Sequence, residues 1–218
     1  MEIIWHGHAC FEIKGERITL VFDPFGGIGL PEPNAQADIV VCSHSHGDHN
    51  NVEPVLKKGG VVLEGFVGSQ KVQDVSVKGI ATLHDAAGGS QRGNNSVAVV
   101  DLDGLKLCHL GDLGHDLSSN QSQEIGSIDV LFTPVAGGAT IGPEIAASII
   151  ERLRPKIVVP MHYNPDLPGT PSWFPRAMPI GLDEFLSGKK NIEKIQGRSV
   201  TISTDNLPKE QAIIVLSL

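Results

Sequence analysis

The six residues HSHGDH at positions 44–49 constrain this chain more than any other part of its sequence. They bring three imidazoles and one carboxylate together directly after the apolar run IVVC at positions 39–42. Neutral imidazole and carboxylate are ligand types that suit zinc, iron and manganese. Because His44 and His46 are two residues apart, an extended turn would point both of them at one ion. The motif therefore predicts a metal site, in which Asp48 and His49 follow after a turn and can reach a second point nearby.

Composition argues against several other classes of function. The 218 residues carry a formal net charge of −8, which disfavours nucleic acid as a partner because phosphates are bound mainly by Lys and Arg. The sequence shows neither an apolar run of the ~18–20 residues that span a membrane nor a secretory signal. Cys10, Cys42 and Cys108 are scattered, without a C-x-x-C pair, which argues against disulfides. We therefore expect a cytoplasmic protein that binds neither nucleic acid nor a membrane.

Short apolar runs separated by turn residues predict a chain built mainly of strands. These runs occupy residues 2–5, 10–14, 17–22, 38–42, 61–63, 72–77, 80–83, 96–102, 105–110, 129–133, 157–160, 199–203 and 212–216. Helices are expected at 51–58, ended by Gly59-Gly60, at 143–153, which begins with a proline, and at 182–186. Because no linker interrupts the chain, residues 1–218 are expected to form a single mixed α/β domain.

Candidate ligands recur at the ends of the predicted strands. Besides His44, a histidine or an aspartate closely follows four other apolar runs: Asp23, His84, Asp112 and His162. In layered α/β folds, sites form at strand ends because the sheet holds the loops in fixed positions. Each residue taken singly has a structural alternative, since a strand-end aspartate such as Asp23 often caps the following turn. As a set, they indicate loops that converge on one site.

Seven short motifs follow one another from the start of the chain to about residue 165. They are GHACF at 7–11, FDPF at 22–25, HSHGDH at 44–49, TLH at 82–84, HLGD at 109–112, TPVAGG at 133–138 and PMHY at 160–163. In this order they resemble the motifs of compact metal-dependent hydrolases of the metallo-β-lactamase fold, a cytoplasmic subgroup similar to the ascorbate-6-phosphate lactonases. H-x-H-x-D-H is the most specific of the seven.

The resemblance implies an α/β (α+β) fold, a four-layer αβ/βα sandwich, with a dinuclear metal site along one edge. His44, His46 and His84 would hold the first metal, Asp48, His49 and His162 the second, and Asp112 would bridge both. Asp23 would hydrogen-bond a ligand imidazole and fix its tautomer. Two divalent cations are expected as cofactors, zinc foremost, with manganese or iron as alternatives.

The chemistry that the resemblance implies is hydrolysis of a small molecule by a hydroxide that bridges the two cations. Asp48 and Asp112 would take part in catalysis. The leaving group would receive a proton from Asp48, His109 or His115, among which the sequence does not choose. His109 and His115 lie three residues either side of Asp112. His8 is interpreted as a structural imidazole.

Substrate choice is expected to depend on the loops at 25–36, 88–95 and 164–179, which adjoin ligand strands. Arg92 could bind an anionic group, and Trp173-Phe174 could wall an apolar pocket. The chain has no room for the inserted domain of the superfamily's nucleases or the C-terminal domain of its thiolester hydrolases. A lactone or a phosphoester is therefore the expected substrate. The sequence is compatible with a homo-oligomer.

Two other functions are compatible with the same ligands. An iron oxidase or dioxygenase, mononuclear or di-iron, is one, because imidazole and carboxylate suit iron as well as zinc. A non-catalytic protein that keeps a metal for structure is the other. Structural zinc sites are usually closed and four-coordinate, and seven candidate ligands around an open edge argue against one.

Overall fold

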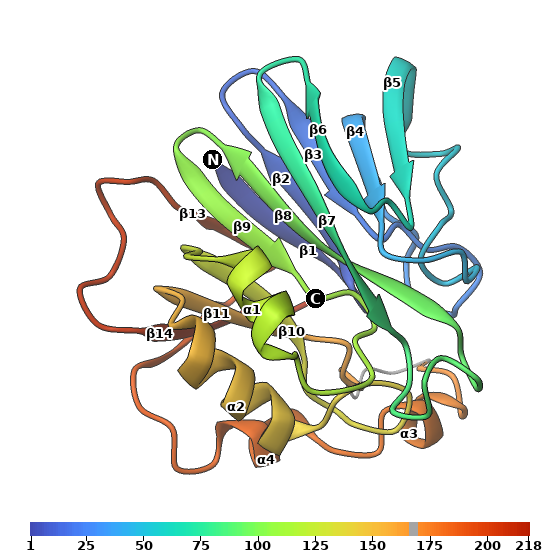
Figure 1. Cartoon of the computed structure of the whole chain (residues 1–218), viewed down its shortest axis with the longest axis vertical. Helices are drawn as coiled ribbons and strands as arrows, with labels where there is room; N and C mark the ends of the chain where they lie inside the picture. The colour runs from blue at the N-terminus through green and yellow to red at the C-terminus, as the bar shows by residue number, and fades with distance from the viewer. Residues whose placement is uncertain (166–169) are drawn as a thin grey trace.

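A computed structural model of the protein describes residues 1–165 and 170–218, and its strands form two mixed sheets that face each other (Figure 1). The first sheet has the order β13 (Ser199–Thr201), β1 (Glu2–Gly7), β2 (Cys10–Lys14), β3 (Thr19–Phe22), β4 (Ala37–Cys42) and β5 (Leu56–Glu64). The second has the order β12 (Ile192–Lys194), β14 (Ala212–Val215), β11 (Ile157–Met161), β10 (Val130–Pro134), β9 (Leu105–His109), β8 (Asn94–Leu102), β7 (Val75–Leu83) and β6 (Gly68–Val72). The expected sandwich is confirmed.

The helices are few and all lie in the second half of the chain. They are α1 (Ser119–Ile125), α2 (Pro143–Leu153), α3 (Phe174–Ala177) and α4 (Leu182–Leu186). Helix α1 packs on β7 and α2 on β10, so both cover the outer face of the second sheet (Figure 1). Helix α2 has the predicted bounds, with Pro143 in its first turn and Ala146, Ile149 and Leu153 buried. Residues 1–118 contain no helix, so strands β1 to β5 of the first sheet are joined by turns and loops alone.

Aromatic side chains from the two sheets meet in the core. The Phe11 ring of the first sheet lies 4.5 Å from the Phe132 ring of the second, measured between centroids, and Phe22 lies 6.0 Å from Phe132. All three side chains are fully buried. Such pairs of rings contribute packing energy beyond the apolar area that they bury. This cluster holds the two sheets in register with each other.

The strands that precede the candidate ligands end at one edge of each sheet. In the first sheet β3 and β4 are parallel, and β1 shares their direction because a single antiparallel strand, β2, separates it from β3. In the second sheet β9, β10 and β11 are parallel, and β7 shares their direction because β8 lies antiparallel between β7 and β9. The loops after β1, β3, β4, β7, β9 and β11 can therefore build one site.

The prediction of a helix at 51–58 is wrong. The Leu56 N–H donates to the Val52 carbonyl in a single turn, and the chain then enters β5. Gly59-Gly60, which was expected to end the helix, lies inside β5, where Gly59 has a φ of 84° and the register against β4 shifts. The two glycines accommodate an irregularity in a strand, which is the other common use of glycine in such a position.

The strand expected at 72–77 is also wrong, because a hairpin turn interrupts it. Gln73 and Asp74 form this turn between β6 and β7, and Gln73 adopts a φ of 52°. Helix α1, which begins with a capping box formed by Ser118 and Gln121, was not predicted. Only Ile125 of this helix is buried, so its apolar pattern was too weak to detect. The strand β12 and the helix α3 were missed as well.

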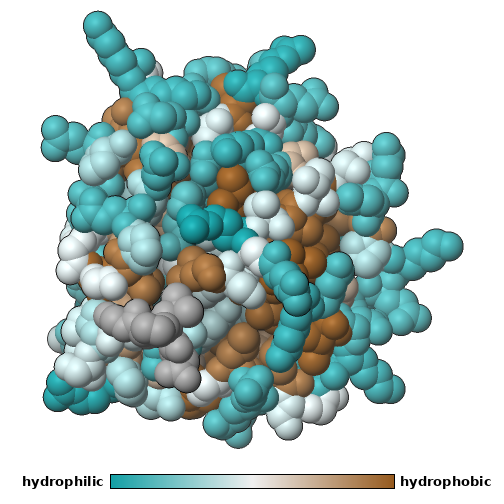
Figure 2. Space-filling model, turned by 180° about the vertical axis from the view of Figure 1, so that it is seen from behind, coloured by the Kyte–Doolittle hydropathy of each residue, from teal (hydrophilic) through white to brown (hydrophobic). Residues whose placement is uncertain are grey.

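The surface is polar for the most part. Figure 2 shows the face behind that of Figure 1, where polar side chains are interspersed with apolar residues. Among the described residues, the exposed large apolar side chains are Val62, Val67 and Trp173. No helix within residues 1–165 and 170–218 is long and apolar enough to cross a membrane.

We predict that Phe132→Ala destabilises the fold strongly, because it removes the ring that both Phe11 and Phe22 contact. Truncation of a fully buried phenylalanine costs about 3–5 kcal/mol. Val67→Ala is the control, since this side chain is 56% exposed and its loss should change the free energy of unfolding by less than about 0.5 kcal/mol. Urea unfolding of the two variants measures both values. Equal midpoints would contradict the proposed role of the aromatic cluster.

Candidate metal centre

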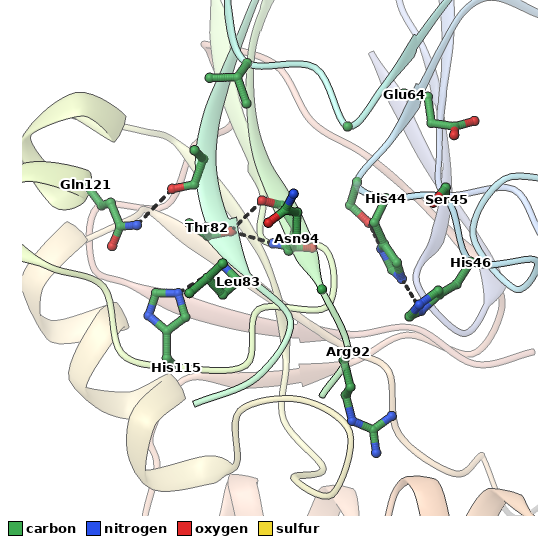
Figure 3. Close-up of a pocket in the computed structure, with 16 residues that line it drawn as sticks. His44, Ser45, His46, Glu64, Thr82, Leu83, Arg92, Asn94, His115 and Gln121 are labelled. Atoms are coloured by element: carbon green, nitrogen blue, oxygen red, sulfur yellow. Dashed lines mark hydrogen bonds between the residues drawn. The ribbon is translucent and has the colours of Figure 1, made fainter. Parts of the chain in front are cut away.

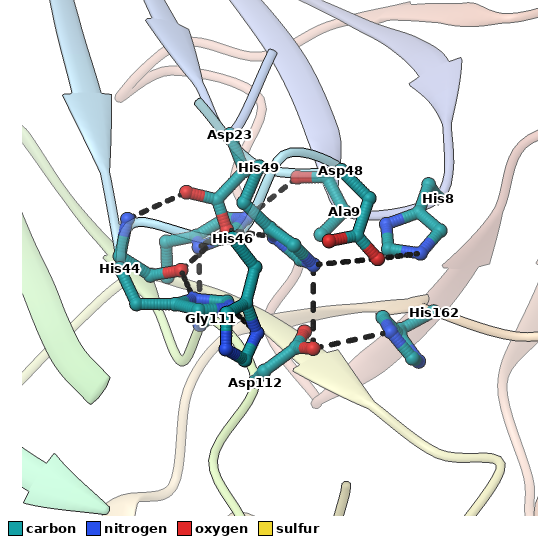
Figure 4. A network of polar contacts seen from close by, with 12 residues as sticks. His8, Ala9, Asp23, His44, His46, Asp48, His49, Gly111, Asp112 and His162 are labelled. Atoms are coloured by element: carbon teal, nitrogen blue, oxygen red, sulfur yellow. Dashed lines mark hydrogen bonds and ion pairs between the residues drawn. The ribbon is translucent and has the colours of Figure 1, made fainter. Parts of the chain in front are cut away.

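The predicted ligands converge where the edges of the two sheets meet. Three groups of side chains place donor atoms within 4.8 Å of one another: His44, His46 and His84; His44, His49 and Asp112; and His8, His49 and His162. Asp48 belongs to none of these groups, but its Oδ2 lies 3.9 Å from His49 Nε2. The structure therefore places all seven predicted ligands around one centre and adds His8. Figure 4 shows His8 with six of the seven, His84 excepted.

The first group has the spacing expected of ligands to one cation. His44 Nε2 lies 3.0 Å from His46 Nδ1, and the His84 ring packs against both rings. Two nitrogens that bind the same tetrahedral zinc lie about 3.3 Å apart, given Zn–N distances of about 2.0–2.1 Å. Two imidazole lone pairs this close need a proton or a cation between them. The residues present therefore fit a divalent cation at this position.

Asp112 lies at the middle of the centre. Its Oδ2 is 3.1 Å from His84 Nε2, 3.2 Å from His49 Nε2 and 3.3 Å from His162 Nε2. The carboxylate is almost completely buried, and its other oxygen, Oδ1, has no hydrogen-bond partner among the described residues. A buried charge of this kind requires compensation. Asp112 Oδ2 thus faces His84 from the first predicted ligand set and His49 and His162 from the second, which is the position that a bridging ligand requires.

Asp23 orients the imidazoles of His49 and His44 through hydrogen bonds on the side away from the centre. Its Oδ2 accepts a hydrogen bond from His49 Nδ1 at 2.9 Å and from the Ser43 hydroxyl at 2.7 Å, while Oδ1 accepts from the Ser43 N–H. The Ser43 oxygen in turn accepts from His44 Nδ1 at 2.9 Å. With Nδ1 held by these hydrogen bonds in both rings, Nε2 of His49 and of His44 is the nitrogen left to bind a cation. The contact expected of Asp23 is thus present, and it reaches two ligands.

The loop that carries Asp112 is fixed by close contacts with its neighbours. The Asp112 N–H donates to Asn95 Oδ1, and the Asn95 amide donates to the Leu110 carbonyl. Gly111 has a φ of 56°, and a Cβ at this position would lie 2.4 Å from the Ser43 Cβ. Glycine is therefore required before Asp112, because it alone combines this backbone conformation with this approach.

Burial and charge set the protonation states of these groups. Burial lowers the pKa of His44 to about 4, so that its imidazole is neutral at neutral pH. Burial would raise the pKa of Asp112, but His162 and His49 outweigh it and hold this pKa well below its usual range. Burial would likewise lower the pKa of His49, but Asp112 and Asp23 raise it well above the ordinary value. Before a cation binds, a proton on His49 therefore neutralises part of the aspartate charge.

Two predicted proton donors have both ring nitrogens engaged with the backbone. His109 is buried, its Nε2 lies 2.9 Å from the Ala9 carbonyl, and its Nδ1 accepts from the Gly111 N–H. His115 accepts from the Leu83 N–H at Nε2, and its Nδ1 lies 2.7 Å from the Asp116 carbonyl. Among the described residues, the ion pairs of Asp112 are with His49, His84 and His162, and include neither of these rings. A role for them as proton donors stays a prediction, and Asp48 is the partly exposed alternative within the centre.

His8 lies inside the centre, although a structural role was predicted for it. It follows β1, is 1% exposed and has a φ of 53°, which is unusual for a residue other than glycine. Its ring centroid lies 4.3 Å from that of His162 and 4.8 Å from that of His49. The one available signal was its place directly after a strand, next to a glycine. His6, two residues earlier, pairs with Glu12 outside the centre.

Comparison with known proteins identifies the family. Residues 2–162, which contain every ligand named above, match the beta-lactamase superfamily domain. The chain belongs to the metallo-β-lactamase superfamily. A metal-dependent hydrolase of Thermococcus onnurineus is 32% identical over 186 residues, which cover 72% of this chain and 82% of that protein. A metal-dependent hydrolase of Geobacillus sp. is 30% identical over 225 residues, which cover 88% of this chain and 100% of that protein.

A solved structure supports the same assignment. It is described as a candidate zinc-dependent hydrolase of the metallo-β-lactamase superfamily from Thermotoga maritima, and it is 37% identical to this chain. The superposition has a TM-score of 0.81 and covers 99% of this chain and 98% of the other. The protein is accordingly a metal-dependent hydrolase of the metallo-β-lactamase superfamily, with a cluster of histidine and aspartate that can bind metal.

In this member of the superfamily a cavity of about 600 Å³ opens beside the first ligand group (Figure 3). It is lined by Ser43, His44, Ser45, His46, Glu64, Gly65, Val67, Ala81, Thr82, Leu83, Arg92, Gly93, Asn94, Asn95, His115 and Gln121. Of the loops expected to choose the substrate, 88–95 lines this cavity and 25–36 does not. The connection between β5 and β6, which was not expected there, also contributes.

Trp173 and Phe174 do not line this cavity. Phe174 is fully buried, with its ring centroid 6.3 Å from that of His8, and Trp173 packs on Phe174 while remaining 37% exposed. The loop expected at 164–179 lies in part, at 166–169, outside the described residues. Of the residues considered for substrate binding, Arg92 is the one that the structure places at the cavity.

We predict that Asp23→Asn weakens metal binding by about 10–100-fold, the usual effect of losing a carboxylate that orients a ligand imidazole. The amide cannot supply the charge that stabilises a protonated Nδ1 on His49. Asp74→Asn makes the same chemical change at an 83% exposed side chain and should leave the affinity unchanged. Competition with a chromophoric chelator measures both affinities. Equal affinities for the two variants would show that Asp23 does not orient the ligands.

We also predict that metal uptake at pH 7 releases a proton from His49, because its raised pKa keeps it protonated and a ligand imidazole must be neutral. His44, whose pKa is about 4, should release none. Apparent affinity should therefore rise between pH 6 and pH 8. Titration calorimetry in buffers with different ionisation enthalpies counts the protons, and a binding enthalpy that is independent of the buffer would contradict the prediction.

Proposed function

We propose that the protein hydrolyses a small-molecule lactone or phosphoester with the help of two divalent cations. One observation supports this above all: the buried Asp112 oxygen faces His84 from the first ligand set and His49 and His162 from the second. A single structural zinc would need four closed ligands. In this protein the histidine donors lie on both sides of the Asp112 carboxylate, and a cavity adjoins His44 and His46.

Two bound cations would supply an electrophile and an activated water at neutral pH, as in other two-metal sites. The residues of the chain orient the ligands. Asp23 and Ser43 hold His44 and His49 so that Nε2 faces the centre. The loop at Gly111 holds Asp112 between the two sets. Zinc is the cation that we expect first, with manganese or iron as alternatives, since imidazole and carboxylate suit all three.

Asp48 is placed to move protons between the centre and solvent. Its side chain is 34% exposed, and its Oδ2 lies 3.7 Å from His8 Nε2 and 3.9 Å from His49 Nε2. It is the carboxylate of the centre that both touches the ligand cluster and reaches solvent. We therefore assign to it, ahead of His109 and His115, the transfer of a proton to the leaving group.

The cavity favours a small polar substrate. Arg92 and Glu64 lie at its wall on opposite sides of the His44 and His46 pair, and Thr82, Asn94 and Asn95 supply further polar groups (Figure 3). Its volume of about 600 Å³ suits a small molecule better than a polymer. The Arg92 guanidinium can bind a carboxylate or phosphate of that substrate.

We predict that Asp112→Asn lowers kcat/KM by at least about 10³-fold and reduces the bound metal, because it removes the charge shared by both ligand sets. A panel of lactones, phosphodiesters and phosphomonoesters, assayed with the zinc, manganese and iron forms, identifies the substrate class first. Asp101→Asn, an exposed aspartate of β8, is the matched control and should retain activity. Unchanged metal content and hydrolysis in the Asp112 variant would refute the proposed site.

The same experiment tests the alternatives. An iron oxidase or dioxygenase would consume oxygen in its iron form and hydrolyse nothing in the panel. A non-catalytic metal-binding protein would bind metal and turn over no substrate in any form. The comparisons favour hydrolysis, since the relatives above are named hydrolases.

A further inference from the structure

His8 has the environment of a ligand although it lies outside the H-x-H-x-D-H motif. Three of the buried histidines, His8, His84 and His162, share one pattern: Nδ1 has no hydrogen-bond partner among the described residues, and Nε2 faces a carboxylate of the centre. Two of the three belong to the predicted ligand sets. The two buried imidazoles outside the predicted ligand sets and the centre differ: His6 Nε2 pairs with Glu12, and both ring nitrogens of His109 pair with the backbone.

The position of His8 is that of a donor to the second cation. Its Nε2 lies 3.7 Å from Asp48 Oδ2, and its donor atom lies within 4.8 Å of those of His49 and His162. Figure 4 shows the ring on the same side of Asp112 as Asp48 and His162, away from His44 and His46. At 3.7 Å the contact between His8 Nε2 and Asp48 is too long for a hydrogen bond, and a shared cation would give this buried nitrogen a partner.

The backbone holds His8 in this place. The His8 carbonyl accepts two hydrogen bonds, from Trp5 Nε1 at 3.1 Å and from the His162 N–H at 3.2 Å. These two contacts stabilise a left-handed conformation, and His162 adopts the same conformation with a φ of 52°. Strained backbone of this kind persists where surrounding contacts determine it, and it clusters at functional sites. The loops after β1 and β11 are thus fastened to each other at the second ligand set.

We propose, building on the dinuclear function above, that His8 is a direct ligand of the second cation, together with Asp48, His49, His162 and Asp112. A tetrahedral zinc that keeps one position open for substrate accepts three protein donors, and the second position would have five. The first position, with His44, His46, His84 and Asp112, has four. For the second position, the alternatives manganese and ferrous iron, which accept a higher coordination number, therefore take precedence over the zinc expected for the site as a whole.

The test is metal binding by a His8→Asn variant. Asparagine tolerates the positive φ, so the substitution removes the imidazole and keeps the backbone. Equilibrium dialysis with elemental analysis should show two manganese or cobalt ions in the wild type. In the variant the second should bind more than about 100-fold more weakly, beyond the 10–100-fold loss typical of residues that only orient a ligand. His8→Gly, which also accepts this φ, serves as a second variant if His8→Asn folds poorly.

The visible spectrum of the cobalt-loaded protein supplies an independent readout, because its bands depend on coordination number. Replacement of His8 should change the bands of the second cobalt and leave those of the first. His6→Ala, which removes another buried imidazole of the same hairpin, is the matched control and should bind both ions with unchanged bands.

The outcomes separate this proposal from the proposed function. A wild type that takes up a single cation would overturn both. A wild type with two cations, together with a His8 variant that binds both with unchanged affinity, would overturn the assignment of His8 alone. Weaker binding with unchanged cobalt bands would also overturn it, since His8 would then only position the ligands.

Discussion

The buried charge of Asp112 is the constraint on which the rest of the centre depends. A carboxylate without access to water is tolerated only where positive charge or hydrogen bonds compensate it. Three imidazoles lie within 3.3 Å of one of its oxygens, and His49 carries the proton that neutralises part of the charge in the metal-free protein. A divalent cation bound by the same imidazoles would take over this role. The site is therefore organised before metal arrives.

The centre exists only when the two sheets are packed together. The first sheet supplies His8, Asp23 and the residues at 44–49, and the second supplies His84, Asp112 and His162. A direct contact between the sheets joins these halves, since the Ser96 N–H donates to the Ser43 carbonyl. Cations that bind both halves bind the folded state alone, so metal binding and the stability of the sandwich are linked.

Much of this arrangement could be predicted from the sequence, because strand ends can be recognised without knowing which strands are neighbours. The runs before Asp23, His44, His84, Asp112 and His162 are apolar enough to indicate strands, and parallel strands place their ends together. The ligand set itself came from the resemblance to a known family. The cavity wall formed by the β5–β6 connection could not be predicted, since residues 56–58 of β5 were interpreted as part of a helix and only 61–63 as a strand. A pair of glycines ends helices and also allows irregular strands, and only the pairing with β4 distinguishes the two.

His8 could not be recognised because its role depends on backbone geometry. His8, Asp23 and His162 all adopt positive φ at the point where a strand ends and the centre begins. Each such residue costs about 1–3 kcal/mol relative to an ordinary conformation. A strand in its usual conformation points successive side chains to alternate faces, and a left-handed residue redirects the chain so that the side chain enters the gap between the sheets. The sequence shows only a polar residue after an apolar run, which is equally compatible with a capped turn.

The strain of these left-handed residues is offset by the hydrogen bonds that they make. The His162 N–H donates to the His8 carbonyl, and the Asp23 carboxylate accepts from His49. The same contacts that give the centre its geometry therefore also keep the strained backbone in place.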